Sequence, residues 1–198
     1  MGFPRNFLLL FGAHVGDARS DARGVARRYN VPDDKKFCYG TGEKEFIAFS
    51  EDCMADADLD TKIIFVGHGG TLGFGEFSSD DWGPFLVKKC GIKRVGLICF
   101  KGCKFGAGSG PEEVANYLDA KGVEFGFLEA YKKDVWYTGN GQFRSGKFAN
   151  SFYSFGGSLF LDKRNKGTTV RVIRGNAKVD HITSIKHLDL AEDLQDPI

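Results

Sequence analysis

Short apolar segments alternate with helical patterns over residues 1–122, and this alternation constrains the fold more than any other feature of the chain. The strongest strands are expected at Phe7–Phe11, Lys62–Val66 and Arg94–Phe100, with shorter ones at Lys36–Tyr39 and Glu45–Phe49. Helical patterns follow over residues 18–29, 78–91 and 109–121, each after one of these apolar segments. Strands that alternate with helices form a mainly parallel sheet with helices packed on it. We therefore predict an α/β fold with a central, mostly parallel sheet flanked by helices on both faces.

Helix boundaries are marked by local side chains. Ser78 and Ser79 can cap the second helix, which is expected to end near Gly91. The stretch "SGPE" at Ser109–Glu112 predicts a capping box, with Pro in the first turn. That helix is expected to stop at Gly122.

The pattern changes to β after residue 122. Strands are expected at 123–128, 135–138, 158–162 and 168–173, with the turns "TGNG" and "KRNKG" between them. We predict one domain over residues 1–198: an α/β core at 1–122, a β-rich extension with a C-terminal β-hairpin flap at 123–180, and a tail at 181–198.

Composition narrows the function classes. The 198 residues are 42% hydrophobic and 27% charged, with a net charge of +1, so nucleic acid is not an expected partner. Five cysteines without regular spacing favour free thiols in a reducing compartment. No apolar run approaches the roughly 20 residues of a membrane span, and the N-terminus reads as a core strand rather than a signal peptide. We expect a cytoplasmic protein, or one delivered into a target-cell cytoplasm without a classical signal peptide.

Two expected strands end in residues suited to thiol chemistry. "IIFVGHGG" places His68 between glycines, and "VGLICFKGCKFG" places Cys103 after a strand and Gly102. Because ligands bind at the carboxyl ends of parallel strands, both residues are candidate site positions. A cysteine nucleophile needs a proton acceptor and donors for the oxyanion, which His68 and the amides of Gly69 and Cys103 could supply.

A structural interpretation stands beside this one. Free cysteines are common core residues, and a histidine at a strand end is often only hydrogen-bonded. Cys99 competes as the thiol, but it lies inside the apolar run and is interpreted as core. On spacing alone, a structural pair is favoured over a catalytic one.

The motifs resemble those of the caspase–gingipain–clostripain superfamily of cysteine peptidases. Within it, the chain is most similar to the autoprocessing domains of large clostridial glucosylating toxins and multifunctional repeat toxins. Two stretches resemble the His and Cys motifs, "TKIIFVGHGG" (Thr61–Gly70) and "VGLICFKGCKFG" (Val95–Gly106). Three weaker matches are "LLLFGAHVGD" (Leu8–Asp17), "KKDVWYTGNGQ" (Lys132–Gln142) and "SLFLDKRNKGTTVRV" (Ser158–Val172).

The resemblance implies a caspase-like fold and a cysteine endopeptidase with a catalytic dyad. Cys103 would attack the scissile carbonyl, and His68 would handle the protons. The amides of Gly69 and Cys103 would form the oxyanion hole. Asp17 matches by position the acid that orients the histidine in some members, although it is equally suited to be the N-cap of the following helix. His14, in the same turn, is the alternative. The substrate would be a protein or peptide, which includes the chain itself.

Basic side chains gather in two parts of the sequence. The helix over residues 18–29 carries Arg19, Arg23, Arg27 and Arg28, and the C-terminal part carries Lys163, Arg164, Lys166, Arg171 and Arg174. Such runs are usually solvated faces, but guanidinium groups also bind phosphate well. The resemblance implies inositol hexakisphosphate as an allosteric effector at these two clusters, with no other cofactor required.

Two further alternatives remain at this point. A catalytically inactive relative would serve as a binding or adaptor domain. A redox or metal-handling domain is the third class, but Cys99 and Cys103 on one strand would lie about 13 Å apart, too far to share one zinc ion. No metal site is therefore expected.

Overall fold

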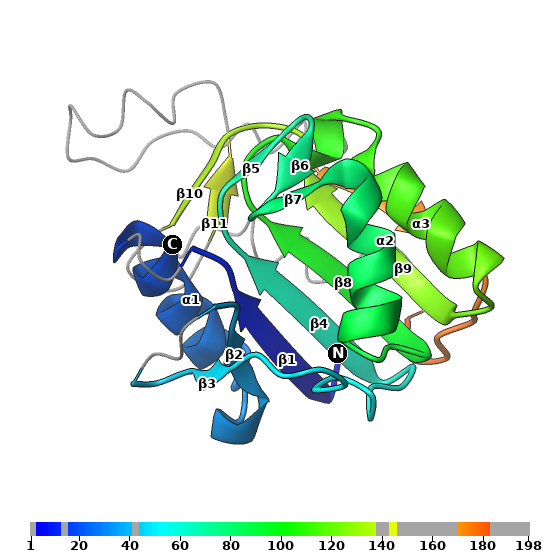
Figure 1. The fold of residues 1–198 in the computed structure, drawn as a ribbon, viewed down its shortest axis with the longest axis horizontal. Helices are drawn as coiled ribbons and strands as arrows, with labels where there is room; N and C mark the ends of the chain where they lie inside the picture. Colours follow the sequence, from blue (N-terminus) through cyan, green and yellow to red (C-terminus); the bar gives the residue numbers. More distant parts are fainter. Residues whose placement is uncertain (1–2, 13–15, 41–43, 138–142, 146–169, 183–198) are drawn as a thin grey trace.

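The computed structural model describes residues 3–12, 16–40, 44–137, 143–145 and 170–182. Its main sheet contains β1 (Arg5–Leu10), β2 (Lys36–Cys38), β3 (Ile47–Ala48), β4 (Thr61–Val66), β8 (Arg94–Lys101), β9 (Glu124–Tyr131) and β12 (Val170–Arg174). The strand order is β12-β9-β8-β4-β1-β2-β3 (Figure 1). All neighbouring strands are parallel except β12, which runs antiparallel to β9. The predicted mostly parallel sheet is confirmed.

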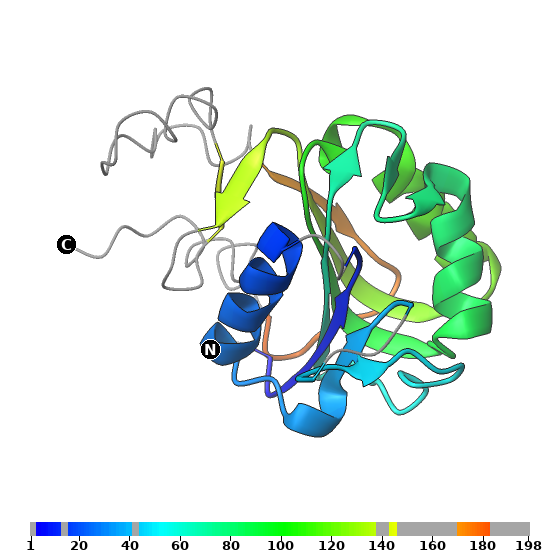
Figure 2. The same ribbon diagram turned by 60° about the vertical axis from the view of Figure 1, so that its left-hand side comes forward.

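Helices cover both faces of this sheet, as the sequence predicts. One face is covered by α1 (Gly16–Arg28), and the other by α2 (Trp82–Pro84), the π-helical turn Phe85–Lys89 and α3 (Gly110–Ala120). Figure 2 shows α1 on one side of the sheet and the other helices on the opposite side. Every residue of β4 is buried, which is typical of a strand covered on both faces.

Alternation along β4 separates the two cores. Ile63 and Phe65 join the core beneath α2 and α3, whereas Ile64 and Val66 join the core beneath α1. The first core is rich in aromatic rings. Trp82 is fully buried there, and its indole N–H donates to the carbonyl of Phe74 at 3.1 Å.

Two small sheets extend the fold near the carboxyl ends of the central strands. The first consists of β5 (Gly69–Gly70), β6 (Gly73–Phe74) and β7 (Phe77–Ser78). The second is an antiparallel pair, β10 (Val135–Tyr137) and β11 (Phe143–Ser145). The sequence pattern predicts β10 but not β5, β6, β7 and β11, because strands of two or three residues carry too few side chains for a periodic pattern.

The predicted boundary at residue 122 is wrong as a boundary of the sheet. β9 was assigned to the extension, but it pairs in parallel with β8 and lies within the central sheet. The C-terminal hairpin stays a prediction, since the described residues show β12 paired only with β9. Its expected partner at 158–162 and the turn at 163–167 lie outside the described residues.

Two details of the helices also differ from expectation. Ser109 does not complete a capping box, since its hydroxyl donates to Glu113 at 2.6 Å and Glu112 is paired with Arg171. The helix expected over residues 78–91 changes type along its length, beginning with the 3-10 turn Ser79–Asp81 and ending in the π-helical turn. Gly122 lies just after α3, which ends at Ala120, and has a φ of 69°.

Candidate active site

The predicted meeting of two strand ends is confirmed. β4 and β8 are neighbours, and Val66 is paired with Lys101 in the register. The contact continues beyond the strands, because the N–H of Gly67 donates to the carbonyl of Lys101 at 3.5 Å. The segments that carry His68 and Cys103 therefore leave the same edge of the sheet side by side.

Glycine is required where these two segments touch. A Cβ added at Gly69 would lie 2.6 Å from the carbonyl oxygen of Cys103 and 3.3 Å from its nitrogen. A Cβ at Gly102 would lie 2.4 Å from the carbonyl oxygen of Gly67. Both distances to oxygen are shorter than any ordinary contact, so a side chain at either position would push the segments apart. The glycines around His68 thus bring two backbones together.

His68 lies between β4 and β5 with an exposed side chain. Its carbonyl accepts a hydrogen bond from Gly75 at 2.7 Å, which closes the β5–β6 turn onto it. The ring of Phe74 packs against the backbone of these segments, close to both Gly69 and Gly102. The aromatic core therefore supports the backbone on either side of the histidine.

Cys103 is half-buried against the start of β10. The N–H of Val135 donates to its sulfur at 3.4 Å, and the thiol lies 3.6 Å from the Val135 carbonyl. Lys104, in the left-handed conformation, pairs with Asp134 at 3.0 Å and holds the same two segments together. The sulfur is thus positioned by backbone groups of the segment that follows β9.

Several groups act on the pKa of the Cys103 thiol. Burial is the largest and raises the pKa above its ordinary value of 9.0, while the Val135 N–H lowers it. Asp134 and Asp21 raise the pKa through their negative charge, and Lys104 lowers it. At neutral pH the thiol is therefore protonated, so an activating base is needed for nucleophilic attack.

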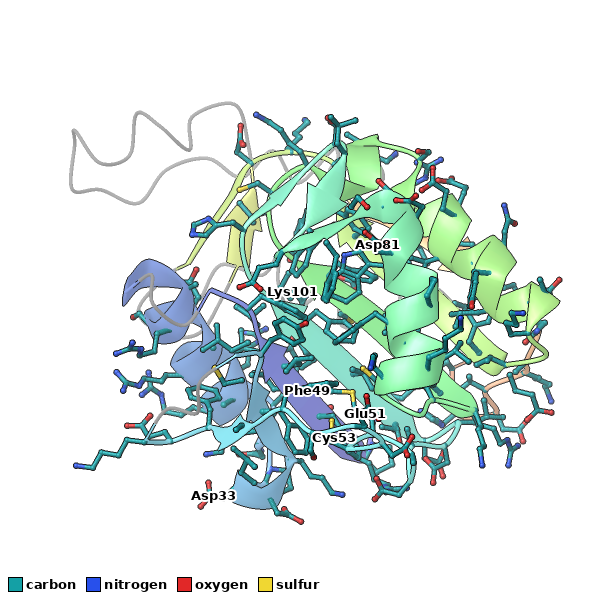
Figure 3. All side chains as sticks on the ribbon, in the orientation of Figure 1. Asp33, Phe49, Glu51, Cys53, Asp81 and Lys101 are labelled. Atoms are coloured by element: carbon teal, nitrogen blue, oxygen red, sulfur yellow. The ribbon has the colours of Figure 1, made fainter. Side chains whose placement is uncertain are left out.

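A buried polar cluster that the sequence pattern did not predict lies beneath this edge. Lys101 pairs with Glu129 at 3.1 Å and contacts the hydroxyl of Tyr131 at 3.4 Å, with both charged residues at most 1% exposed. The thiol of Cys99 donates to Glu129 at 3.4 Å, and Cys99 is a core residue as predicted. Figure 3 labels Lys101 among the strands of the central sheet. The sequence carried one indication of this cluster, because Lys101 and Glu129 are charged residues within largely apolar strands.

The acid carried over from the resemblance is not positioned as an N-cap. α1 begins at Gly16, so Asp17 is the second residue of the helix, and the prediction that Asp17 caps it is wrong. His14 lies outside the described residues.

The basic residues are not gathered into one site among those described. Arg23 pairs with Glu45 at 2.8 Å, and both line a pocket of about 430 Å³ beside β2 and β3 that also contains Arg27. Arg171, at the opposite edge of the sheet, pairs with Glu112 and donates to the carbonyl of Gly108 at 2.7 Å.

The remaining predicted effector residues fall into two groups. Arg28 lies on α1, with its guanidinium carbon 5.7 Å from the centre of the Tyr29 ring, and Arg174 ends β12. Lys163, Arg164 and Lys166 lie outside the described residues. Among the described residues, the two basic clusters lie at opposite edges of the sheet.

The described part of the chain contains no group of three or more His, Cys, Asp or Glu side chains arranged to hold a metal ion. No helix in that part has the length and apolar character needed to cross a membrane. No protein-family model matches this chain, and no curated protein matches it in sequence.

Proposed function

We propose that this protein is a cysteine endopeptidase in which Cys103 and His68 form the catalytic dyad. The observation that carries the proposal is the contact between the Gly69 and Cys103 backbones at the carboxyl edge of the sheet. It sets a half-exposed thiol and an exposed imidazole on adjoining segments. Thiol and imidazole are the two groups that peptide-bond cleavage by a cysteine nucleophile requires.

The proposed reaction begins with proton transfer. His68 takes the proton of the Cys103 thiol, and the sulfur attacks the scissile carbonyl carbon. The amides of Gly69 and Cys103 donate to the oxyanion, and His68 then gives the proton to the leaving amine. Water hydrolyses the resulting thioester. Because burial keeps the free thiol protonated, the proposal requires His68 to act as a base once substrate is bound.

Labelling with a peptidyl electrophile tests the dyad. We expect modification at Cys103 in the native protein and its loss in His68→Ala. Cys53 is the matched control, because it is also a partly exposed free thiol and its labelling should not depend on His68. Labelling of both cysteines alike, or retention of Cys103 labelling in His68→Ala, would contradict the proposal.

A catalytically silent binding or adaptor domain is the second candidate. The observation that favours it is the protonated thiol held against both backbone groups of Val135. Absence of Cys103 labelling in a folded protein would support this candidate over the peptidase. The peptidase proposal includes autoprocessing, a role as a bacterial toxin or effector, and a caspase-like ancestry. Cleavage of the protein's own chain by the purified enzyme would support autoprocessing.

We also propose inositol hexakisphosphate as the effector of the peptidase. Arg27 is the more suitable residue to substitute in the test, because it is exposed and lines a pocket. Arg171, in contrast, pairs with Glu112 and donates to backbone carbonyls. The effector should raise Tm of the native protein, and Arg27→Glu should reduce that rise. Arg94→Glu, at an exposed residue that begins β8, serves as a charge-matched control. No rise in the native protein would refute the effector.

A further inference from the structure

Two free thiols outside the candidate active site lie on segments that are bonded to each other. Cys53 follows β3, and Cys90 directly follows the π-helical turn as its C-cap. The N–H of Asp52 donates to the carbonyl of Lys89 at 2.8 Å, and the N–H of Met54 donates to the carbonyl of Cys90 at 3.1 Å. The two cysteines are therefore held side by side by hydrogen bonds on both sides of Cys53.

These hydrogen bonds limit the separation of the cysteines. With standard bond lengths, the 3.1 Å bond from Met54 to Cys90 keeps the two Cα atoms within about 8 Å of each other. Disulfides join Cα atoms about 4.4–6.8 Å apart, so this limit overlaps the separation that a disulfide spans. Both side chains pack in the same core, beneath α2 and α3.

The two thiols differ in access. Cys90 is fully buried, whereas Cys53 is partly exposed on the segment that also carries Glu51 (Figure 3). An external reagent would therefore reach Cys53 first. Cys90 could react only with a group already attached to Cys53.

We propose that Cys53 and Cys90 form a redox modification site, which a small-molecule disulfide converts to an intramolecular disulfide. The Cys53 thiolate attacks one sulfur of the reagent, forming a mixed disulfide and releasing one thiol. The Cys90 thiolate then attacks the sulfur of Cys53 and releases the second thiol. Two protein thiols are oxidised, and one reagent disulfide is reduced to two thiols.

The bond would close a loop that contains β4, the three strands after it and α2, including His68. It would also fix the two walls of a pocket of about 530 Å³, because Phe49 and Glu51 lie on one wall and Phe85 and Lys89 on the other. Closing a loop of this length should raise Tm by roughly 8–15 °C. The site stands independently of the proposed peptidase activity.

Formation of the bond should be slow at neutral pH. Burial raises the pKa of Cys53 to about 11, with Asp52 adding to the rise and Lys35 and two backbone groups opposing it. Burial also raises the pKa of Cys90, and the nearby Cys53 adds to that effect. Because only thiolates attack disulfides, the rate should increase about tenfold per pH unit between pH 7 and 9.

Oxidised glutathione and the full native chain provide the test. Peptide mapping should find a Cys53–Cys90 crosslink that forms faster at higher pH, together with the rise in Tm. Cys90→Ala should instead accumulate glutathione on Cys53, and Cys53→Ser should form neither product. Cys103→Ala is the control, in which the crosslink should form as in the native chain.

Three results would overturn this inference. The first is a stable glutathione adduct at Cys53 in the native chain, which would mean that Cys90 does not reach it. The second is a crosslink to a different cysteine, or one that forms only in denaturant. The third is the absence of any reaction between oxidised glutathione and Cys53 of the native chain at pH 9.

Discussion

Replacing Gly69 with alanine is the most direct perturbation of the proposed site. The added Cβ would lie 2.6 Å from the Cys103 carbonyl oxygen and 3.2 Å from the Phe74 ring, whereas ordinary contacts begin at 3.4 Å. The Cys103 segment must therefore move by about 0.8 Å, because the aromatic core behind Gly69 leaves little room on the other side. A displacement of about 1 Å at a reacting group can cost on the order of 100-fold in rate.

Gly70→Ala is the matched control. A Cβ at Gly70 meets nothing within 4 Å, although Gly70 is the next residue of the same strand. We expect Gly69→Ala to slow peptidyl-electrophile labelling of Cys103 about 100-fold and to destabilise the protein by about 1–3 kcal/mol through overpacking. Gly70→Ala should change neither quantity appreciably.

Labelling rates and urea denaturation of the three proteins give both readouts. Equal labelling rates for Gly69→Ala and the native protein would refute the inference that the Gly69 and Cys103 backbones must touch for reactivity. A loss of stability without a loss of labelling would give the contact a purely structural role.

Two other predictions follow from buried groups. Lys101→Met should lower the free energy of unfolding in urea by about 3–5 kcal/mol, because it leaves the Glu129 carboxylate buried without its partner. The double variant Lys101→Met/Glu129→Leu should recover most of this loss, and Arg94→Met, at an exposed ion pair, should cost less than about 1 kcal/mol. Lys101→Met as stable as the native protein would contradict the burial argument. Burial holds the pKa of Cys103 above 9.0 in the folded protein, so the unfolded chain releases this proton first. The contribution of Cys103 to the free energy of unfolding should thus be lost as pH rises above about 9. Alkylation of Cys103 by iodoacetamide should accelerate over the same pH range. Fast alkylation below pH 7 would instead indicate a preformed ion pair between Cys103 and His68.

The fold class and the meeting of the two motifs were predictable from the sequence. β4 and β8 are long apolar runs that end in glycine, and such runs form neighbouring parallel strands when helices separate them. The carboxyl ends of neighbouring parallel strands lie at one edge, so His68 and Cys103 had to approach each other once these strands were adjacent. Cys99 could also be assigned to the core from the apolar residues around it.

Other parts of the site could not be predicted because they depend on contacts distant in sequence. Nothing near Cys103 indicates that Val135 would bond its sulfur, since 32 residues separate them. Lys101 and Glu129 are paired only because β8 and β9 are adjacent, and the sequence pattern had placed β9 in a separate extension. The same limitation led to the wrong capping box, because Arg171 from β12 engages Glu112.

The sequence by itself determined which residues are apolar, where the chain turns, and which side chains can carry thiol and imidazole chemistry. These properties depend on residue type and local spacing, which are fixed by covalent order. Only the tertiary structure decided how deeply Cys103 is buried, which backbone groups surround its sulfur, and which charges are paired. A thiol's pKa and a buried ion pair depend on the dielectric surroundings and on partners from distant segments, and these exist only after the sheet has assembled.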